Sequence, residues 1–339
     1  MSKPNRLIAT EEAFGTKEQF DAMRRIVEST NQYDPDLFLW ANTLRGGIVH
    51  DRLLDLDKER IALMNQWGVD MHLLSLTSTG VQMFSPDEGL AIAQSANDQL
   101  AAAIARHPAR LAGLCSIPPQ NPAGAVKELE RAMKKLKLNG CVINSHTNGE
   151  FLCEEKYWPI LEAAEALAAP IYIHPRAPNP LMAAAFRADH LEHAIWGYSV
   201  EVGTHALRLI TSGIFDRFPN LQIVIGHMGE FIPFWLYRID YMHDKTNRFP
   251  AIKRAKITLR PSDYFRRNFA ITTSGVNASA PLKLAITELG AENVLFAIDY
   301  PYQENVDAVP WIRDVDIPYP DKAKVMYQNA ERIFNIAPA

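Results

Sequence analysis

Short apolar runs of strand length recur along this 339-residue chain and alternate with stretches of helical periodicity. Uninterrupted apolar runs are typical of strands that are buried on both faces, and their alternation with helices predicts parallel βαβ units. The sequence places strands near residues 6–12, 69–76, 110–117, 139–145, 170–174, 221–227, 269–274 and 293–299. It places helices near residues 17–29, 57–67, 87–106, 121–136, 156–168, 199–213, 229–243, 279–289 and 320–335.

Eight strands joined by crossover helices predict a (β/α)8 barrel of the TIM type, formed by residues 1–339 as one domain. A doubly wound open sheet is the alternative, because periodicity alone does not close a sheet. The strand count and the chemistry at the strand ends favour the barrel. Residues 16–56 and 176–198 interrupt the alternation, and both follow strand ends. We therefore expect them to lie over the C-terminal face of the barrel as inserted loops.

Ionisable side chains stand where several of these apolar runs end. Glu11 closes the first strand, and Asp299 closes the eighth; His174 and His227 end the fifth and sixth. The C-terminal ends of all strands in a parallel barrel meet at one rim, so distant residues can surround one ion there. Glu12 follows Glu11, and the alternation of side chains along a strand directs it the other way, towards the surrounding helices.

Glu11, His174 and Asp299 together offer two carboxylates and one imidazole as metal ligands. A site rich in oxygen and free of thiolate favours Mn²⁺ or Mg²⁺ over Zn²⁺. It also leaves coordination positions open, as a catalytic metal requires. Each residue also has a structural alternative. Glu11 is then a charged loop residue, His174 a strand-end histidine whose hydrogen bonds are satisfied within the protein, and Asp299 a helix N-cap. The last is disfavoured for Asp299 because Pro301 follows and the next helix begins several residues later.

Five further residues are candidates for proton transfer or substrate binding. Glu230 lies one helical turn after His227 and can hold its second ring nitrogen, fixing the tautomer or keeping the ring protonated. His146 closes the fourth strand and is a candidate substrate contact. Arg45, in a glycine-containing loop, and Arg238, on the helix after His227, are candidates to clamp a second substrate carboxylate. A solvated loop arginine and a surface salt bridge are the alternatives for these two.

Composition argues against other classes of protein. A net charge of −4 and the lack of a Lys/Arg stripe disfavour nucleic acid as a partner. No run of about 18 apolar residues is available to span a membrane. Cys115, Cys141 and Cys153 lack CxxC spacing, which predicts a reduced, cytoplasmic setting. Aromatic stretches around Trp40 and Trp196 are candidates for burial against a second copy of the chain.

The chain resembles the amidohydrolase superfamily, and within it the branch of metal-dependent, non-oxidative aromatic decarboxylases. The resemblance rests on ATEEAF at residues 9–14, YIHP at 172–175, GHMGE at 226–230, DYPY at 299–302 and NAERIF at 329–334. Superfamily hydrolases open with His-x-His on the first strand, whereas the decarboxylase branch has a carboxylate in place of the first histidine, as here. Some relatives keep a histidine at the position of Ala13, so this chain has one metal ligand fewer than those relatives.

The resemblance implies a carboxy-lyase that removes CO₂ from an ortho-hydroxy aromatic acid. It implies that Glu11, His174 and Asp299 hold a divalent metal, with Mn²⁺ favoured and Zn²⁺ or Mg²⁺ as alternatives. It further implies that His227 pairs with Glu230 and that Asp299 supplies a proton. The similarity favours 5-carboxyvanillate as substrate over 2,6- or 2,3-dihydroxybenzoate and salicylate. The branch also implies a homo-oligomer, either a dimer or a tetramer.

Two other classes of function stay open at this point. A metal-dependent hydrolase or hydratase on the same barrel would use His227 to activate water. The glutamate that replaces a first-strand histidine argues against the usual hydrolase. A catalytically inactive barrel that serves as a binding or scaffolding protein is disfavoured by the complete set of ionisable residues at the rim.

Overall fold

The computed structural model describes residues 6–338, whose strands form two parallel sheets. The first holds β1 (Ile8–Phe14), β2 (Met71–Leu76) and β3 (Leu111–Gly113). The second holds β4 (Cys115–Ser116), β5 (Cys141–Asn144), β6 (Ile171–His174), β7 (Ile223–Ile225), β8 (Phe269–Thr272) and β9 (Val294–Leu295). Neighbouring strands follow one another in the sequence, without the reversal of strand order that defines a doubly wound sheet.

Backbone hydrogen bonds join the two sheets into one barrel. β3 and β4 are halves of a single predicted strand, and Leu114 between them donates its N–H to the Leu74 oxygen at 2.8 Å. On the opposite side, Thr10 of β1 donates to the oxygen of Phe296, the residue after β9, at 3.1 Å. The predicted α/β barrel is therefore confirmed, and each predicted strand region contains a strand of the structure.

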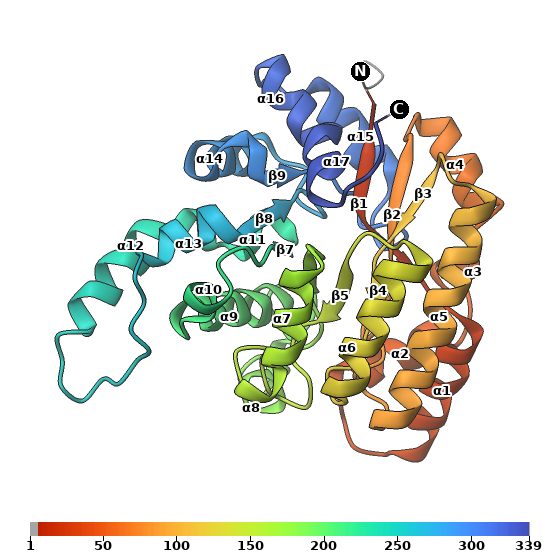
Figure 1. Ribbon diagram of the computed structural model, residues 1–339. Coiled ribbons are helices and arrows are strands. Elements are labelled where there is room, and N and C mark those ends of the chain that lie inside the picture. The colour runs from red at the N-terminus through yellow and green to blue at the C-terminus, as the bar shows by residue number, and fades with distance from the viewer. Residues whose placement is uncertain (1–5, 339) are drawn as a thin grey trace.

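Helices connect the strands and surround the barrel (Figure 1). The longer crossover helices are α4 (Glu59–Trp67), α5 (Pro86–Arg106), α6 (Pro122–Arg131), α7 (Trp158–Ala166), α9 (Gly197–Thr211), α12 (Ile232–Thr246), α13 (Pro261–Asn268) and α14 (Ser279–Leu289). Shorter elements are α10 (Ile214–Arg217), α11 (His227–Glu230), α16 (Tyr319–Ala323), α17 (Asn329–Ile333), the 3₁₀ turns η2 (Glu155–Tyr157), η3 (Arg187–Asp189) and η4 (Ala291–Asn293), and the π-helical η1 (Ala132–Leu136) and η5 (Lys324–Gln328).

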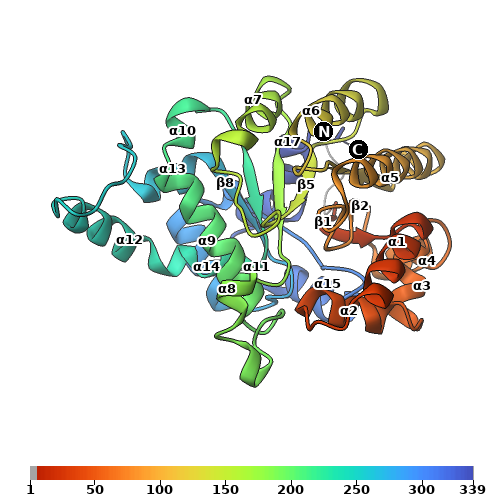
Figure 2. The same ribbon diagram turned by 90° about the horizontal axis from the view of Figure 1, so that it is seen from below.

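Additional helices follow three of the strands. These are α1 (Lys17–Ser29), α2 (Pro35–Thr43) and α3 (Ile48–Leu54) after β1, α8 (Pro180–Ala183) after β6, and α15 (Asn305–Asp314) after β9. Figures 1 and 2 both show α2 and α8 towards one end of the barrel. The sequence predicts α1 but not α2, α3, α13 or α15.

Three predicted helices differ from the structure in ways that local backbone geometry explains. The helix expected near 121–136 is regular only as far as Arg131 and ends in the π-helical η1. The helix expected near 229–243 begins only at Ile232, because Met228, Gly229 and Phe231 adopt left-handed backbone angles that interrupt it. The helix expected near 320–335 is divided into α16, η5 and α17, since a π-helical turn occupies its middle. Hydrophobic periodicity does not distinguish such turns from regular helix.

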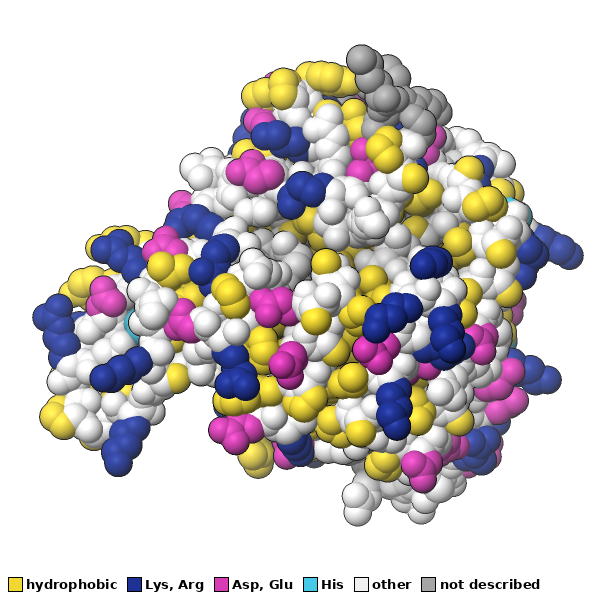
Figure 3. Space-filling view, in the orientation of Figure 1, with side chains coloured by type: hydrophobic (Ala, Val, Ile, Leu, Met, Phe, Trp, Pro, Cys, Tyr) yellow, Lys and Arg dark blue, Asp and Glu magenta, His cyan; other side chains and the backbone are white. Residues whose placement is uncertain are grey.

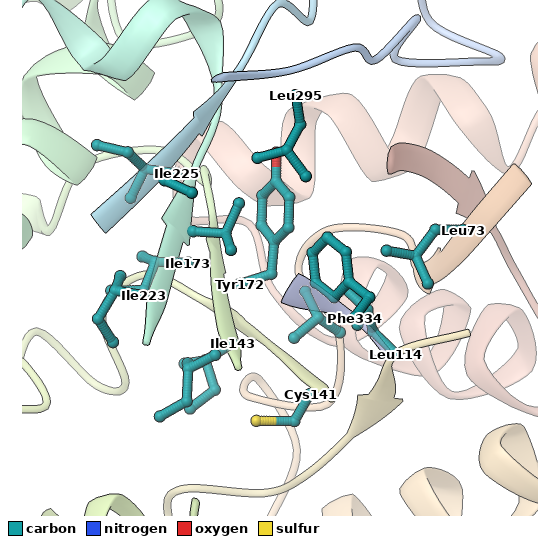
Figure 4. Packing of buried hydrophobic residues seen from close by; sticks show 14 of the residues in the cluster. Leu73, Leu114, Cys141, Ile143, Tyr172, Ile173, Ile223, Ile225, Leu295 and Phe334 are labelled. Atoms are coloured by element: carbon teal, nitrogen blue, oxygen red, sulfur yellow. The ribbon is translucent and has the colours of Figure 1, made fainter. Parts of the chain in front are cut away.

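The core forms because every strand residue is buried. Figure 4 shows apolar side chains of β2, β5, β6, β7 and β9 packed together, among them Leu73, Ile143, Tyr172, Ile225 and Leu295. One cluster of buried hydrophobic residues extends along the chain from Leu7 to Ile336. This packing fixes the strand ends, and with them the side chains at the rim.

The outer surface mixes charges of both signs, as Figure 3 shows for one face. In Figures 1 and 3, α12 and the loop after it project from the body of the protein as an arm. Within residues 6–338, no helix combines the length and apolar character needed to cross a membrane.

Candidate metal centre

The three predicted metal ligands meet at the rim of the barrel. Glu11 lies in β1, His174 ends β6, and Asp299 follows β9. One carboxylate oxygen from each acid and one ring nitrogen of the histidine all lie within 4.8 Å of one another. Glu11 Oε1 and His174 Nε2 are 3.6 Å apart. The barrel thus brings together residues that are 288 positions apart in the sequence.

Two hydroxyl groups orient the Glu11 carboxylate. Its Oε2 atom accepts hydrogen bonds from the Tyr172 hydroxyl and from Thr272 Oγ1, the latter at 2.8 Å. Its Oε1 atom is buried and has no hydrogen-bond partner among residues 6–338. A buried carboxylate oxygen without a donor is unfavourable unless a cation lies beside it. The carboxylate is therefore oriented to offer Oε1 to a metal ion.

His174 presents the other ligand atom in the form that binds metals. Its Nδ1 atom lies 2.9 Å from the Pro175 carbonyl oxygen. That oxygen can only accept, so Nδ1 carries the proton and Nε2 keeps its lone pair. Burial lowers the pKa of His174, and the opposing effect of Glu11 does not overcome it. The neutral imidazole is the form that a metal requires.

Asp299 completes the set with a carboxylate that does not ionise readily beside Glu11. Burial, followed by the charge of Glu11, raises the pKa of Asp299 well above its usual range. Burial also acts to raise the pKa of Glu11, but the nearby His227 and the hydrogen-bond donors around the carboxylate, Tyr172 among them, contribute to a net downward shift. Two carboxylates in one site resist joint ionisation unless a cation compensates them. The described donors therefore fit a divalent metal.

His227 and Glu230 form the predicted pair at the same rim. His227 Nδ1 lies 2.8 Å from Glu230 Oε1, and the backbone N–H of His227 donates to Ser274 Oγ at 3.1 Å. Gly229 between them has a φ of 78°, which lets the chain turn tightly enough for the contact. Burial lowers the pKa of His227, but Glu230 and Glu11 outweigh it and raise the pKa to about 10. The pair therefore favours a protonated imidazole.

A cavity of about 320 Å³ lies over these residues, a size found in small-molecule sites. Its walls are Asp36, Leu39, Trp40, Thr43, Ser78, Thr79, His174, Pro175, His193, Ala194, Tyr198, His227, Asp299, Tyr302 and Gln303. Many come from α2 and from the segment after β6, the two insertions that the sequence places over this face. Thr79 Oγ1 is buried without a hydrogen-bond partner in the described chain, so it is free to contact a ligand.

The sequence patterns do not single out most of these cavity residues individually. Ser78 and Thr79 closely follow β2, so the strand-end rule that identifies Glu11 could have identified them. Asp36 and His193 are recognisable only as members of the two inserted segments. Their place in the cavity depends on how those segments pack, which strand patterns do not reveal.

The other three predicted contacts lie outside the lining of the cavity. His146 is buried, with Nε2 3.1 Å from the Ala177 oxygen, and burial lowers its pKa to about 3. Arg45 is exposed, with Nη1 3.3 Å from Asn42 Oδ1. Arg238 is exposed on α12, and its guanidinium lies 6.0 Å from the centroid of the Trp235 ring.

Comparison with known proteins identifies the family. Residues 33–336 match the family model described as "Amidohydrolase". The chain belongs to the amidohydrolase family. It is 36% identical over 300 residues to a gamma-resorcylate decarboxylase of Polaromonas sp. (strain JS666 / ATCC BAA-500), which covers 85% of this chain and 90% of the relative.

Solved structures of amidohydrolases with named decarboxylase activity match nearly the whole chain. The 5-carboxyvanillate decarboxylase from Sphingomonas paucimobilis is 49% identical, with a TM-score of 0.95 and coverage of 98% of this chain and 99% of that one. The enzyme of that name from Novosphingobium aromaticivorans DSM 12444 is 38% identical, with a TM-score of 0.94 and coverage of 97% and 96%. The latter was crystallised with manganese and 4-hydroxy-3-methoxy-5-nitrobenzoic acid.

The orientation of Glu11 predicts the effect of Glu11→Gln. The hydroxyls of Tyr172 and Thr272 both donate to one side of the carboxylate, so the amide oxygen of glutamine will face them. The amide NH₂ will then occupy the position of Oε1 and repel a cation. We expect the affinity for Mn²⁺ to fall by at least about 100-fold, since the loss of a residue that only supports a metal ligand already costs about 10- to 100-fold. Metal titration, with elemental analysis of the dialysed protein, measures this.

Glu128→Gln is the matched control, because Glu128 is equally buried but pairs with Arg131 and Asn97 away from the rim. The control should bind Mn²⁺ like the wild type. Wild-type Mn²⁺ affinity in Glu11→Gln would contradict the ligand assignment.

Proposed function

We propose that this amidohydrolase is a Mn²⁺-dependent carboxy-lyase that removes CO₂, without oxidation, from an ortho-hydroxy aromatic acid, and that its substrate is 5-carboxyvanillate. The observation that carries the proposal is Glu11 Oε1, which has no hydrogen-bond partner among the described residues and lies beside His174 and Asp299 under a cavity suited to one aromatic ring. The 49% identity to a 5-carboxyvanillate decarboxylase, against 36% to a gamma-resorcylate decarboxylase, supports the choice of substrate.

The chemistry requires a way to store the electrons of the broken bond. Direct loss of CO₂ from an aromatic ring leaves an aryl carbanion in the ring plane, where the charge does not delocalise. An ionised ortho hydroxyl instead raises the electron density at the carbon that bears the carboxylate. That carbon then accepts a proton and the ring becomes a dienone. Cleavage of the carbon–carboxylate bond releases CO₂, and the electron pair restores the aromatic ring.

The residues at the rim divide this work between them. A bound divalent metal would supply the positive charge that orients the phenolate and carboxylate oxygens of the substrate. Asp299 lines the cavity beside that position and is our proposed carrier of the proton to the ring carbon. A bound cation lowers the pKa of a carboxyl group. We therefore propose that Asp299 takes its proton from the substrate phenol as that group ionises.

His227 acts from the same wall of the cavity. Glu230 occupies its Nδ1 side, so the Nε2 side of the ring is left for the substrate. A protonated imidazole there donates a hydrogen bond to the carboxylate that leaves as CO₂. Glu230 keeps the ring oriented and charged through this step.

Assay of the Mn²⁺-loaded enzyme with 5-carboxyvanillate tests this function. We expect release of CO₂ and formation of vanillate, loss of activity on chelation, and recovery with Mn²⁺. Asp299→Asn should lower kcat by about 100- to 10,000-fold, the range contributed by a positioned proton donor. Chromatography of the products and measurement of the released CO₂ follow the activity of the wild type and of the variant. Addition of water without CO₂ release would instead indicate a hydratase, and near-normal kcat in Asp299→Asn would remove the proton-transfer role.

We propose that Arg45 selects for the second carboxylate of 5-carboxyvanillate. No Lys or Arg lines the cavity within residues 6–338, so this carboxylate needs a cation from its edge. Thr43 lines the cavity, and Arg45 stands two residues later on the exposed loop, held only by Asn42 among the contacts described. The side chain is therefore available to turn onto a bound ligand.

Arg45→Ala should lower kcat/KM for 5-carboxyvanillate by about 10- to 100-fold, since a hydrogen bond to a charged group contributes about 1.5–3 kcal/mol. The value for 2,6-dihydroxybenzoate, which lacks the second carboxylate, should change little. Arg25→Ala, at an exposed arginine of α1 that pairs with Glu88 of α5, is the control. Equal losses on both substrates would contradict a role in selectivity, and Arg238→Ala in the same assays tests the second predicted clamp.

We also propose a homo-oligomer assembled through the α12 arm. Phe234, Trp235, Tyr237 and Tyr241 of this helix are 50–83% exposed, a large apolar surface for a monomer. Light scattering coupled to gel filtration should give a multiple of 38.1 kDa. Tyr237→Glu should shift the mass towards one chain, while a wild-type mass of 38.1 kDa would contradict the proposal.

The cellular setting that we propose is the cytoplasm. Cys115, Cys141 and Cys153 are all free thiols, as expected of a reducing compartment.

A further inference from the structure

We propose that Glu12 is a positioning residue that holds Asp299, and so couples two ligands of the metal centre. This inference rests on the proposed metal centre. It gives a role to a carboxylate that points away from the cavity and that the sequence directs towards the surrounding helices.

The Glu12 carboxylate binds the backbone on both sides of Asp299. Its Oε1 atom accepts a hydrogen bond from the N–H of Ile298 at 2.9 Å, and its Oε2 atom accepts one from the N–H of Tyr300 at 3.0 Å. The side chain is fully buried. Both oxygens are therefore committed to the two peptide groups that flank the ligand.

Asp299 needs such support because its backbone is strained and lies beyond the sheet. It has a φ of 75°, in the left-handed region that residues with a side chain rarely adopt. Strained conformations of this kind persist only where the surroundings enforce them. β9 ends at Leu295, four residues earlier, so regular strand pairing does not hold this position. The Glu12 carboxylate replaces the missing ladder bonds.

A buried arginine closes the other side of this arrangement. The Arg60 guanidinium lies 4.7 Å from the centroid of the Tyr300 ring, and its Nη2 atom donates to the Ala13 oxygen at 2.7 Å. Ala13 in turn donates its N–H to the Tyr300 oxygen at 2.7 Å. Arg60 thus packs on the residue after Asp299 while it bonds to the residue after Glu12.

Two consecutive residues of β1 therefore contribute to two different ligands of the proposed metal centre. Glu11 faces His174 and Asp299 and offers its own oxygen, whereas Glu12 binds the backbone on both sides of Asp299 and fixes the chain that carries it. A shift of β1 moves both together, so the separation between the two ligand carboxylates is preserved. The device sets the geometry of the metal centre without touching the metal or the substrate.

Glu12→Gln is the sharpest test, because it keeps the size of the side chain and removes one acceptor. One of the two backbone N–H groups will then face an amide NH₂, and the chain at Asp299 will lose a hydrogen bond. We expect the Kd for Mn²⁺ to rise about 10- to 100-fold and kcat to fall in the same range, as for other residues that orient metal ligands. KM should change little, since the walls of the cavity are untouched.

Asn329→Leu is the matched control for simple loss of stability. Asn329 is also buried, and its Nδ2 atom donates to the Ala291 and Val294 oxygens, both at 2.7 Å, at the opposite end of β9. The variant loses two hydrogen bonds near the same strand but none at the rim. It should lower Tm yet bind Mn²⁺ like the wild type.

Free Mn²⁺ is measured by electron paramagnetic resonance during titration of the three proteins, well below the lowest Tm. Weaker binding in Glu12→Gln alone supports the proposal. Wild-type affinity in Glu12→Gln, or equal losses in both variants, overturns it. If the wild type binds no Mn²⁺, the proposed metal centre fails instead.

Hydrogen exchange of the metal-free wild type also tests the contacts of Glu12. This experiment needs no metal and does not depend on whether a variant folds. The amides of Ile298 and Tyr300 should exchange slowly, like those of neighbouring strands. Exchange as fast as that of an exposed loop would overturn the role of Glu12.

Discussion

The free energy of burying carboxylate charge governs the rim of this barrel. Glu11 and Asp299 approach closely enough to share one ion, and Glu11 Oε1 meets no donor among the described residues. Such an arrangement is unfavourable unless a cation or a proton compensates it. His174 adds a neutral nitrogen with its lone pair free. A divalent cation satisfies all three groups at once, which explains why the fold tolerates them together.

Different strands and turns of the barrel carry the different residues of this rim. β1, β6 and the segment after β9 bring the three proposed ligands together, while the turn after β7 brings His227 and Glu230 to the same rim. The insertions after β1 and β6 supply much of the wall of the cavity over this rim. The proposed metal ligands, the His227–Glu230 pair and the cavity wall thus come from different parts of one barrel.

The sequence predicts the barrel and the main residues at its rim because both depend on local patterns. An apolar run reveals a buried strand, and an ionisable residue at its end has few reasons to be there other than chemistry. The same patterns do not reveal the left-handed turn at Met228 or the π-helical turn in η5, which depend on the surrounding packing.

Long-range contacts are the second limit. Strand alternation correctly directs Glu12 away from Glu11. The hydrogen bonds between Glu12 and the N–H groups of Ile298 and Tyr300 join β1 to the segment after β9, where the barrel closes. No sequence pattern in either segment predicts them. Arg45 and Arg238 lie on exposed surfaces outside the cavity lining, and their roles stay predictions.

Anomalous X-ray diffraction from crystals grown with Mn²⁺, recorded on both sides of the manganese absorption edge, locates the metal and its ligands without ambiguity. We expect one strong anomalous peak at bonding distance from Glu11 Oε1, His174 Nε2 and the Asp299 carboxylate. A peak held by other residues, or none at a Mn²⁺ concentration that supports activity, would contradict the proposed metal centre.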